Sequence, residues 1–217
     1  MNSYEKKQQI LNNIREQLEQ STPIPYPDIK NEELELFEKT ESNALLSLFK
    51  VQFEALGGVF IELDNYQDLT IALKNLAMQH QWSEVVCSSK ELFHFLVEEH
   101  LDFIREPSTQ ARLATAPACI TECEAAIART GSFIFSSQQN RGRTATILYP
   151  NHLVIVRKNQ LLQDLKDGFN LMNQKYSKDF PSMVNVTTGP SRTADIEKTL
   201  VTGIHGPQAI YCLFIHK

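Results

Sequence analysis

Residues 189–207 hold the densest group of side chains that could bind a small molecule. The group combines turn-forming glycines, hydroxyls, a guanidinium and an imidazole: Gly189, Ser191, Arg192, Thr193, Asp195, His205 and Gly206. Glycine and proline favour turns, and hydroxyls cap helix starts, so the pattern predicts two turns around one short helix that begins near residue 194. The free N–H groups of that helix, the hydroxyls and Arg192 would together bind a phosphate or a carboxylate.

Each of these features also has a purely structural explanation. Arg192 could pair with Asp195 or Glu197, and a well-capped helix with a solvated arginine needs no ligand. His205 could act as a general acid or base, or its ring could hydrogen-bond the backbone and hold the turn. No catalytic residue is assigned from the sequence, and the candidates are His205 and Glu124.

Two further polar stretches could contact the same ligand. Thr130, Gly131 and Ser132 offer hydroxyl and backbone donors, although such a turn also serves as a tight connection between two elements. A later polar loop carries Arg141 and Arg143, which could close on an anion or stay in solvent, as surface arginines usually do. The sequence thus predicts a binding site for a small anion.

The composition excludes several classes of protein. A chain of 217 residues with 42% hydrophobic and 22% charged residues is typical of a globular protein. The net charge of −5 argues against a general nucleic-acid or membrane-surface binder. No apolar run approaches the roughly 20 residues that span a bilayer, and the N-terminus lacks the apolar core of a signal peptide. We therefore expect no membrane span and a cytoplasmic location.

The four cysteines, Cys87, Cys119, Cys123 and Cys212, do not suggest a disulfide framework in a chain of this length. Cys119 and Cys123 are four residues apart and could share one helical face. No Cys-x-x-Cys pair and no nearby histidine completes a metal site with them. We expect buried free thiols, and neither a metal nor another cofactor.

The elements that must position these residues alternate along the chain. Helical patterns cover residues 4–20, 32–56, 66–80, 90–97 and 161–176, and residues 125–128 have the character of a helix end. Short apolar segments typical of strands cover residues 59–63, 85–87, 133–135, 146–149, 152–156, 183–187 and 209–215. Such alternation predicts an α/β fold, a three-layer α/β/α arrangement with a mainly parallel sheet.

The N-terminal segment differs from the rest of the chain. Its amphipathic helix carries a narrow apolar stripe that could pack on the body of the protein or on a partner. The three prolines at 23, 25 and 27 then predict a stiff linker. We predict an N-terminal extension at residues 1–30 and one α/β domain at residues 31–217.

Ligands of open parallel sheets bind outside the carboxyl ends of the strands. The loops at residues 130–132, 136–145 and 187–193 each follow or adjoin a predicted strand. Whether they lie at one edge of the sheet depends on the strand order, which the sequence leaves open.

From about residue 85 onward the chain resembles the LUD-domain family, and within it the lactate-utilisation protein C group. The segments that carry the resemblance occur in the family's order, at residues 120–128, 130–132, 152–156, 189–197 and 203–207. The resemblance implies a fold similar to the NagB/RpiA/CoA-transferase-like group. This agrees with the α/β fold predicted from the alternating pattern.

The resemblance also implies a role in oxidising L-lactate to pyruvate, beside a cysteine-rich protein and an iron–sulfur protein. This chain lacks the cysteine motifs of that iron–sulfur partner, so it would be the subunit without a redox centre. Many family members carry an acid just before the Thr-Gly pair, where this chain has Arg129; a catalytic acid would then be Glu122 or Glu124. The alternatives are a stand-alone CoA-transferase-like or phospho-substrate enzyme, or a small-anion sensor on the same fold.

Overall fold

The computed structural model describes residues 3–19, 38–107, 115–140, 142–196 and 199–217, without the side chains of residues 194–201. The chain divides into two units, Met1–Glu38 and Lys39–Lys217, and each is described by itself. The predicted domain boundary at residue 30 and the proline-rich linker lie outside the described residues.

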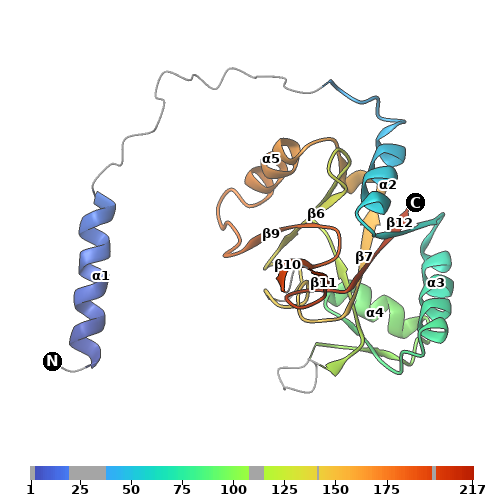
Figure 1. Cartoon of the computed structure of the whole chain (residues 1–217), viewed down its shortest axis with the longest axis horizontal. Helices are drawn as coiled ribbons and strands as arrows, with labels where there is room; N and C mark the ends of the chain where they lie inside the picture. Colours follow the sequence, from blue (N-terminus) through green and yellow to red (C-terminus); the bar gives the residue numbers. More distant parts are fainter. Residues whose placement is uncertain (1–2, 20–37, 108–114, 141, 197–198) are drawn as a thin grey trace. The chain divides into compact units, whose positions relative to one another are not determined.

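The first unit contains one helix, α1 (Ser3–Glu19), within its described part (Figure 1). No residue of α1 is buried, and Ile10, Ile14 and Leu18 are exposed. Because these three residues are four positions apart, they lie along one face of the helix. The predicted amphipathic helix is confirmed.

The second unit is built on a six-stranded sheet in which every neighbouring pair is parallel. Its strands, in spatial order, are β1 (Val59–Leu63), β12 (Ala209–Ile215), β7 (Asn151–Arg157), β4 (Ala118–Glu122), β2 (Val85–Cys87) and β3 (Ile104–Arg105). All the carboxyl ends therefore share one edge of the sheet, and all the amino ends share the other. The α/β class with a mainly parallel sheet is confirmed.

A second, four-stranded sheet is present that the sequence pattern did not reveal. Its order is β8 (Leu161–Leu162), β5 (Ala125–Ile127), β6 (Ser132–Ser136) and β9 (Val184–Thr188). Strand β5 pairs parallel with β8 and antiparallel with β6, and β6 pairs antiparallel with β9.

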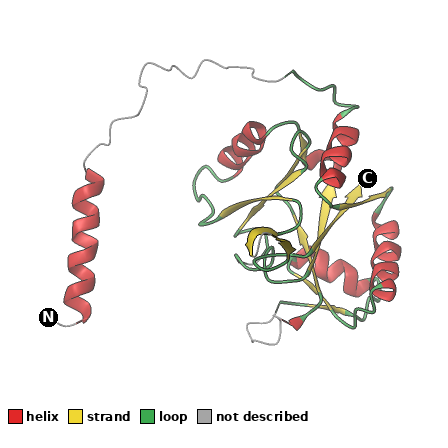
Figure 2. Cartoon of the chain, in the orientation of Figure 1, coloured by secondary structure: helices red, strands yellow, loops and turns green. Residues whose placement is uncertain are grey.

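Helices lie on both sides of the parallel sheet (Figure 2). Helices α3 (Tyr66–Gln79) and α4 (Lys90–Glu98) share one apolar cluster with one face of the sheet. Helix α2 (Leu45–Ala55) and the inner face of the second sheet share another cluster with the opposite face. Helix α5 (Leu165–Lys175) packs on the outer face of the second sheet.

Aromatic rings of α2 pack against the two sheets. Phe49 and Phe53 are fully buried, and their ring centroids lie 5.5 Å and 5.2 Å from that of Phe133 in β6. Burying one such side chain stabilises the fold by about 1.5–3 kcal/mol. This contact holds the second sheet in a fixed position on the first.

Several predicted elements differ from the structure. The helix expected at residues 32–56 begins only at Leu45 where it is described, and residues 32–37 lie outside the described part. The helix expected at residues 161–176 begins at Leu165, and residues 146–149 form turns rather than a strand.

The helix end expected at residues 125–128 is strand β5. Ala126 faces the cluster beneath α2, whereas Ala125 and Ile127 face α5. This alternation has the period of a strand, and burial of both faces outweighs alanine's preference for helices.

The short helix expected after Thr193 is a hairpin of β10 (Arg192–Ile196) and β11 (Thr199–Thr202). Arg192 pairs with Thr202, and Thr193 pairs with Val201. The helix prediction is wrong because threonine, valine and isoleucine dominate the segment, and β-branched residues favour strands. A hydroxyl followed by acids is thus not specific for a helix start.

Candidate functional site

The hairpin and its two turns lie at the amino edge of the parallel sheet. The Gln208 backbone N–H donates to the Pro150 carbonyl over 2.7 Å, directly before β12 and β7 begin. The Ser191 N–H donates to the Pro207 carbonyl over 2.9 Å, and the Ser191 carbonyl accepts from the Gly203 N–H over 3.0 Å, so backbone hydrogen bonds join the two turns to each other. The described residues of the 189–207 segment therefore lie opposite the edge where ligands of parallel sheets usually bind.

The exposed Arg192 is engaged by the backbone of another element. Its Nη2 donates a hydrogen bond to the carbonyl of Leu56, the residue that caps the carboxyl end of α2. A cation at the negative end of a helix stabilises it by about 0.3–1 kcal/mol. The sequence predicted the positive amino end of a helix beside Arg192, but the structure has the negative carboxyl end of α2 there. The geometry therefore supports a structural role for Arg192, in which it stabilises that helix end.

The Thr130–Ser132 turn packs against the same helix. Ser132 Oγ lies 2.8 Å from the Thr130 hydroxyl and 2.8 Å from the Thr188 hydroxyl. Gly131 has a φ of +60°, and a Cβ there would lie 2.6 Å from the Phe53 backbone nitrogen. The structure thus brings this turn, the adjacent Gly189 and Arg192 together around the end of α2, with Gly189 directly against Leu56.

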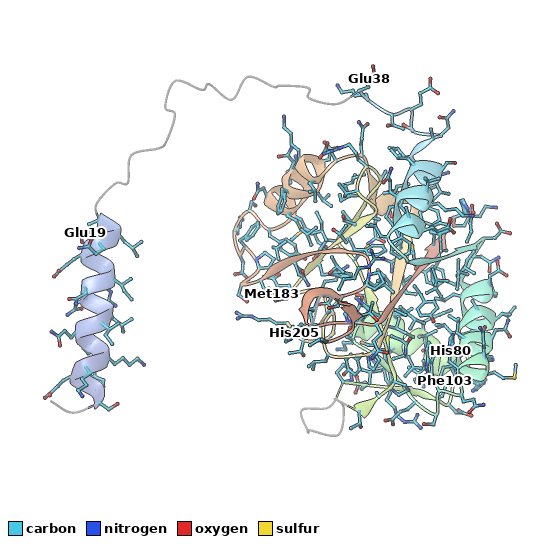
Figure 3. All side chains as sticks on the ribbon, in the orientation of Figure 1. Glu19, Glu38, His80, Phe103, Met183 and His205 are labelled. Atoms are coloured by element: carbon cyan, nitrogen blue, oxygen red, sulfur yellow. The ribbon has the colours of Figure 1, made fainter. Side chains whose placement is uncertain are left out.

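The remaining predicted residues are more scattered. His205 is exposed on the side of the domain that carries the hairpin (Figure 3), and it lines an open pocket of about 480 Å³ with Gly206 and residues 147–150. Thr193 lies in β10, and the Asp195 side chain lies outside the described part. Arg143 is exposed, and Arg141 lies outside the described residues. The binding role of this group stays a prediction.

Polar and charged side chains line a different pocket, of about 410 Å³, at the carboxyl edge of the parallel sheet. The ends of β2, β4 and β7 and the start of α4 contribute to it, together with the end of α5. Its lining residues are Ser89, Lys90, Glu91, Glu122, Gln139, Arg157 and Lys175.

Glu122 is a buried carboxylate at the wall of this pocket. It accepts a hydrogen bond of 2.5 Å from Ser89 Oγ and forms an ion pair with Arg157. Arg157 Nε also donates to the Tyr66 hydroxyl over 2.7 Å. Burial alone would lower the pKa of Arg157, but its bonds to Tyr66 and Glu122 outweigh burial and raise it. The guanidinium is therefore a permanent positive charge held in one orientation.

Glu124 lies behind the pocket with its side chain only 1% exposed. It accepts hydrogen bonds from Lys175 Nζ over 2.7 Å, from the Tyr176 hydroxyl over 2.7 Å and from Ser136 Oγ over 2.5 Å. Burial alone would lower the pKa of Lys175, but the hydrogen bond and charge of Glu124 outweigh it and raise that pKa. These three donors surround Glu124. The geometry therefore supports a role for Glu124 in holding Lys175 in place rather than in attacking a substrate.

Gln139, in the wall of the pocket, has a buried side-chain oxygen without a hydrogen-bond partner among the described residues. Its Nε2 donates to the Cys123 carbonyl over 2.8 Å, and its buried Oε1 has no hydrogen-bond partner. The Cys123 carbonyl also accepts from Gln160 Nε2 over 2.5 Å. The pocket wall therefore combines the cations Lys90, Arg157 and Lys175 with the carboxylates Glu91 and Glu122.

Arg129, the residue before the Thr-Gly pair, joins β5 to α5. Its Nε and Nη2 donate to the two carboxylate oxygens of Asp164 over 2.8 Å and 2.7 Å. This hydrogen bond is the main reason why the pKa of Asp164 lies below its usual range. Arg129 therefore connects the end of β5 to the cap of α5.

The cysteines are buried free thiols, as expected. Burial raises the pKa of Cys119, Cys123 and Cys212, so these thiols are protonated at neutral pH. Within the described ranges, no group of three or more histidines, cysteines or acids could hold a metal ion. None of the described helices is long and apolar enough to cross a membrane.

The sequence interpretation missed the roles of Ser89, Gln139, Arg157 and Lys175. Ser89 and Arg157 stand at the ends of predicted strands, and that position was a usable signal. Glu122 ends β4, which was not predicted, so nothing in the pattern placed it beside the other two. The position of Gln139 depends on how a loop folds back over the sheet.

Comparisons with known proteins agree with the fold. A family model described as "LUD domain" matches residues 46–215. A crystal structure of a DUF162 family protein from Deinococcus radiodurans superposes with a TM-score of 0.61 at 18% identity, covering 82% of this chain and 99% of that one. At this level of identity, the superposition shows the fold alone.

Similar curated proteins bear the name "Lactate utilization protein C". The protein from Anoxybacillus flavithermus is 25% identical over 181 residues, which cover 79% of this chain and 80% of that protein. The protein from Deinococcus radiodurans is 31% identical over 118 residues, 53% of this chain and 55% of that one. The protein from Bacillus subtilis is 34% identical over 97 residues, 43% of this chain and 40% of that one.

Proposed function

The chain belongs to the LUD-domain family, and on this premise we propose that it serves in lactate utilisation as a subunit without a redox centre of its own. It binds a small organic anion and works beside iron–sulfur proteins in the oxidation of lactate to pyruvate. The names of its relatives support the part in lactate utilisation. Electron transfer belongs to the partners, because the cysteine spacing of this chain does not match an iron–sulfur motif.

We locate the anion in the carboxyl-edge pocket rather than beside Arg192. The observation that carries this choice is the convergence of Lys90, Arg157 and Lys175 on one pocket at the carboxyl ends of β4 and β7. The start of α4 adds the positive end of a helix dipole at the same pocket, because Lys90 is its first residue. Arg192, by contrast, already contacts a helix carboxyl end that would repel an anion.

Deletion of the chain from its host tests the role in lactate utilisation. We expect the deletion strain to lose growth on L-lactate but not on pyruvate, and the tagged protein to co-purify with iron–sulfur proteins. Complementation with the wild-type chain should restore growth on L-lactate. A strain that grows normally on L-lactate, together with a protein that never co-purifies with iron–sulfur partners, would contradict the proposal.

Thermal shift measurements test the anion site. The purified chain is heated with L-lactate, pyruvate, inorganic phosphate or coenzyme A as separate probes. An anion present at 100 times its Kd should stabilise the fold by about 2.7 kcal/mol. Stabilisation by coenzyme A alone would instead support the stand-alone enzyme of the CoA-transferase type.

A further inference from the structure

Helix α1 carries a line of side chains, most of them apolar, none of which is buried. Tyr4, Ile14 and Leu18 are 68%, 49% and 78% exposed. Together with Lys7 and the half-buried Leu11 they are spaced alternately three and four positions apart, so all five lie along one face of the helix. Two helices pack in a coiled coil at this spacing, and we call the line of five residues the seam.

The charged residues of α1 cancel one another. Three bases are balanced by three acids: Lys6, Lys7, Arg15, Glu5, Glu16 and Glu19. A helix that lies on an anionic membrane surface carries an excess of lysine and arginine on its polar face. The balanced charge of α1 therefore favours a protein partner over a membrane surface.

Lys7 distinguishes a helix from a groove as the partner of the seam. It lies within the seam, between Tyr4 and Leu11. An apolar groove on a globular protein would take its ammonium group out of water, which is unfavourable without a buried counter-charge. Near the end of a helix pair, by contrast, the stem of a lysine covers apolar side chains while its ammonium group stays in water. The seam therefore fits a second helix.

Lys7 also fixes the direction of that helix if it belongs to another copy of this chain. In a parallel pair in register, the two Lys7 side chains lie opposite each other, and like charges repel. In an antiparallel pair, Leu11 packs against Ile14 of the other copy. Lys7 then lies opposite Leu18 of that copy and beside its Glu19, the last residue of α1 (Figure 3). The helix is thus complementary to itself in the antiparallel direction.

The dipole of α1 supports the same direction. Glu5 suits the positive amino end of the helix, whereas Lys6 and Lys7 oppose it. The last turn contains Glu16 and Glu19 and no base, so it opposes the negative carboxyl end. In an antiparallel pair, the lysines of one helix lie beside the carboxyl end of the other, and the glutamates lie beside the amino end. Pairing therefore makes an unfavourable distribution of charge favourable.

We propose that α1 pairs with α1 of a second copy of this chain in an antiparallel two-helix coiled coil, with Lys7 of each copy beside Glu19 of the other. A twofold axis relates the two helices, so the assembly closes as a dimer. The seam covers only about two heptads, so the pairing is weak and depends on protein concentration. Because α1 belongs to the first unit, this inference is independent of the anion site in the second.

Sedimentation equilibrium of the full chain at rising concentration tests the pairing. We expect monomers to convert to dimers as the concentration rises. Ile14→Gln removes an apolar side chain from two layers of the pair but introduces a good helix former, so the dissociation constant should rise by about tenfold or more. Asn13→Gln is the control, because Asn13 lies outside the seam, and its dissociation constant should stay within about twofold of the wild-type value.

An exchange of charges tests the direction. Lys7→Glu sets a second carboxylate beside Glu19 at both ends of the pair, so the dissociation constant should rise by about fivefold. The double variant Lys7→Glu with Glu19→Lys should return to within about twofold of the wild-type value. The double variant Lys7→Glu with Glu16→Lys has the same net charge, but Glu16 lies on the face opposite the seam, so the weakening should remain.

Each contrary outcome would overturn a stated part of the proposal. A wild-type chain that stays monomeric at every concentration would overturn the pairing. A dimer that Ile14→Gln leaves unchanged would lie on another surface and would overturn it as well. An unchanged dissociation constant in Lys7→Glu would contradict the antiparallel direction. If Ile14→Gln instead lowers the melting temperature of the second unit, α1 packs on its own chain and the proposal is wrong.

Discussion

The two edges of the parallel sheet hold their polar side chains in different ways. At the amino edge, the 189–207 segment is joined by backbone hydrogen bonds, and its Arg192 contacts the exposed end of α2. At the carboxyl edge, the carboxylates Glu122 and Glu124 are buried and paired with cations that line a pocket. The difference teaches that charged residues far apart in sequence gather around one pocket when their strands end together, whereas the polar residues that are adjacent in sequence mainly join turns and a helix end.

Gly131→Ala gives the largest expected effect at the amino edge. A Cβ at this position would lie 2.6 Å from the Phe53 nitrogen, on backbone that cannot move aside easily. We expect a loss of about 3 kcal/mol or more in the free energy of unfolding, since the clash adds to the strain of a positive φ. Chemical denaturation measures it.

Gly142→Ala is the matched control for that clash. Gly142 also has a positive φ, of +133°, but a Cβ there meets nothing within 4 Å. Its loss should stay near 1 kcal/mol, the cost of backbone strain alone. Equal losses in both variants would show that close packing against α2 is unimportant.

Acid should lower the free energy of unfolding through His152, which lies in the amino half of β7. Burial lowers the pKa of His152 from 6.5 to about 3, so the folded protein keeps this ring neutral while the unfolded chain gains a proton. The contribution of the neutral His152 ring to the free energy of unfolding is complete above pH 6.5 and is lost as the pH falls from 6.5 towards 3. One pKa unit represents roughly 1.4 kcal/mol, and the total loss is several times that amount.

His152→Phe tests this pH dependence, because phenylalanine does not titrate. The variant should lose the decline in stability between pH 6.5 and pH 4 that the wild-type protein shows in urea denaturation. If the free energy of unfolding falls with pH equally steeply in both proteins, groups other than His152 cause the decline.

Glu124→Leu removes the most enclosed charge at the carboxyl edge. Lys175, Tyr176 and Ser136 would lose their common acceptor. We expect a loss of about 3 kcal/mol in the free energy of unfolding, because breaking a buried ion pair leaves its partners uncompensated. Glu91→Leu, at an exposed position of the same pocket, should stay within about 0.5 kcal/mol of the wild-type protein.

Arg192→Ala should have the smallest effect. The substitution removes one hydrogen bond and one favourable charge at the end of α2, which is worth about 1 kcal/mol or less. If Arg192→Ala lowers the free energy of unfolding as much as Glu124→Leu, the exposed contact at the amino edge stabilises the fold as strongly as the buried ion pair at the carboxyl edge, which would contradict the comparison.

The sequence predicted the fold class because strands and helices leave local periodicities. The segments at 59–63, 85–87, 152–156 and 209–215 were all found as strands of the parallel sheet. Strand β4 (Ala118–Glu122) was not predicted because it ends in the polar residues Thr121 and Glu122, although all five of its residues are buried. Because this strand was not predicted, the sequence named Glu122 as a candidate acid but did not place it beside Arg157.

The site could be predicted only in part, because strand order comes from long-range pairing. Arg157 and Glu122 meet because β7 and β4 are neighbours in register, with Glu122 opposite Ile155. No local pattern contains that information. The 189–207 segment, by contrast, was conspicuous because its residues are adjacent in sequence. Its hydroxyls and acids led to the prediction of a helix, although its β-branched residues favoured strands.

The measurement that tests the central claim most directly is L-lactate binding by the wild-type chain, Arg157→Gln and Arg192→Ala under identical conditions. Lys90→Ala is added because Lys90 is exposed and its removal does not disturb the buried pairs. We predict that Arg157→Gln and Lys90→Ala each weaken binding, Arg157→Gln by about tenfold or more, and that Arg192→Ala stays within about twofold of the wild-type affinity. Loss of binding in Arg192→Ala, with binding intact in both other variants, would contradict the account and place the anion at the amino edge.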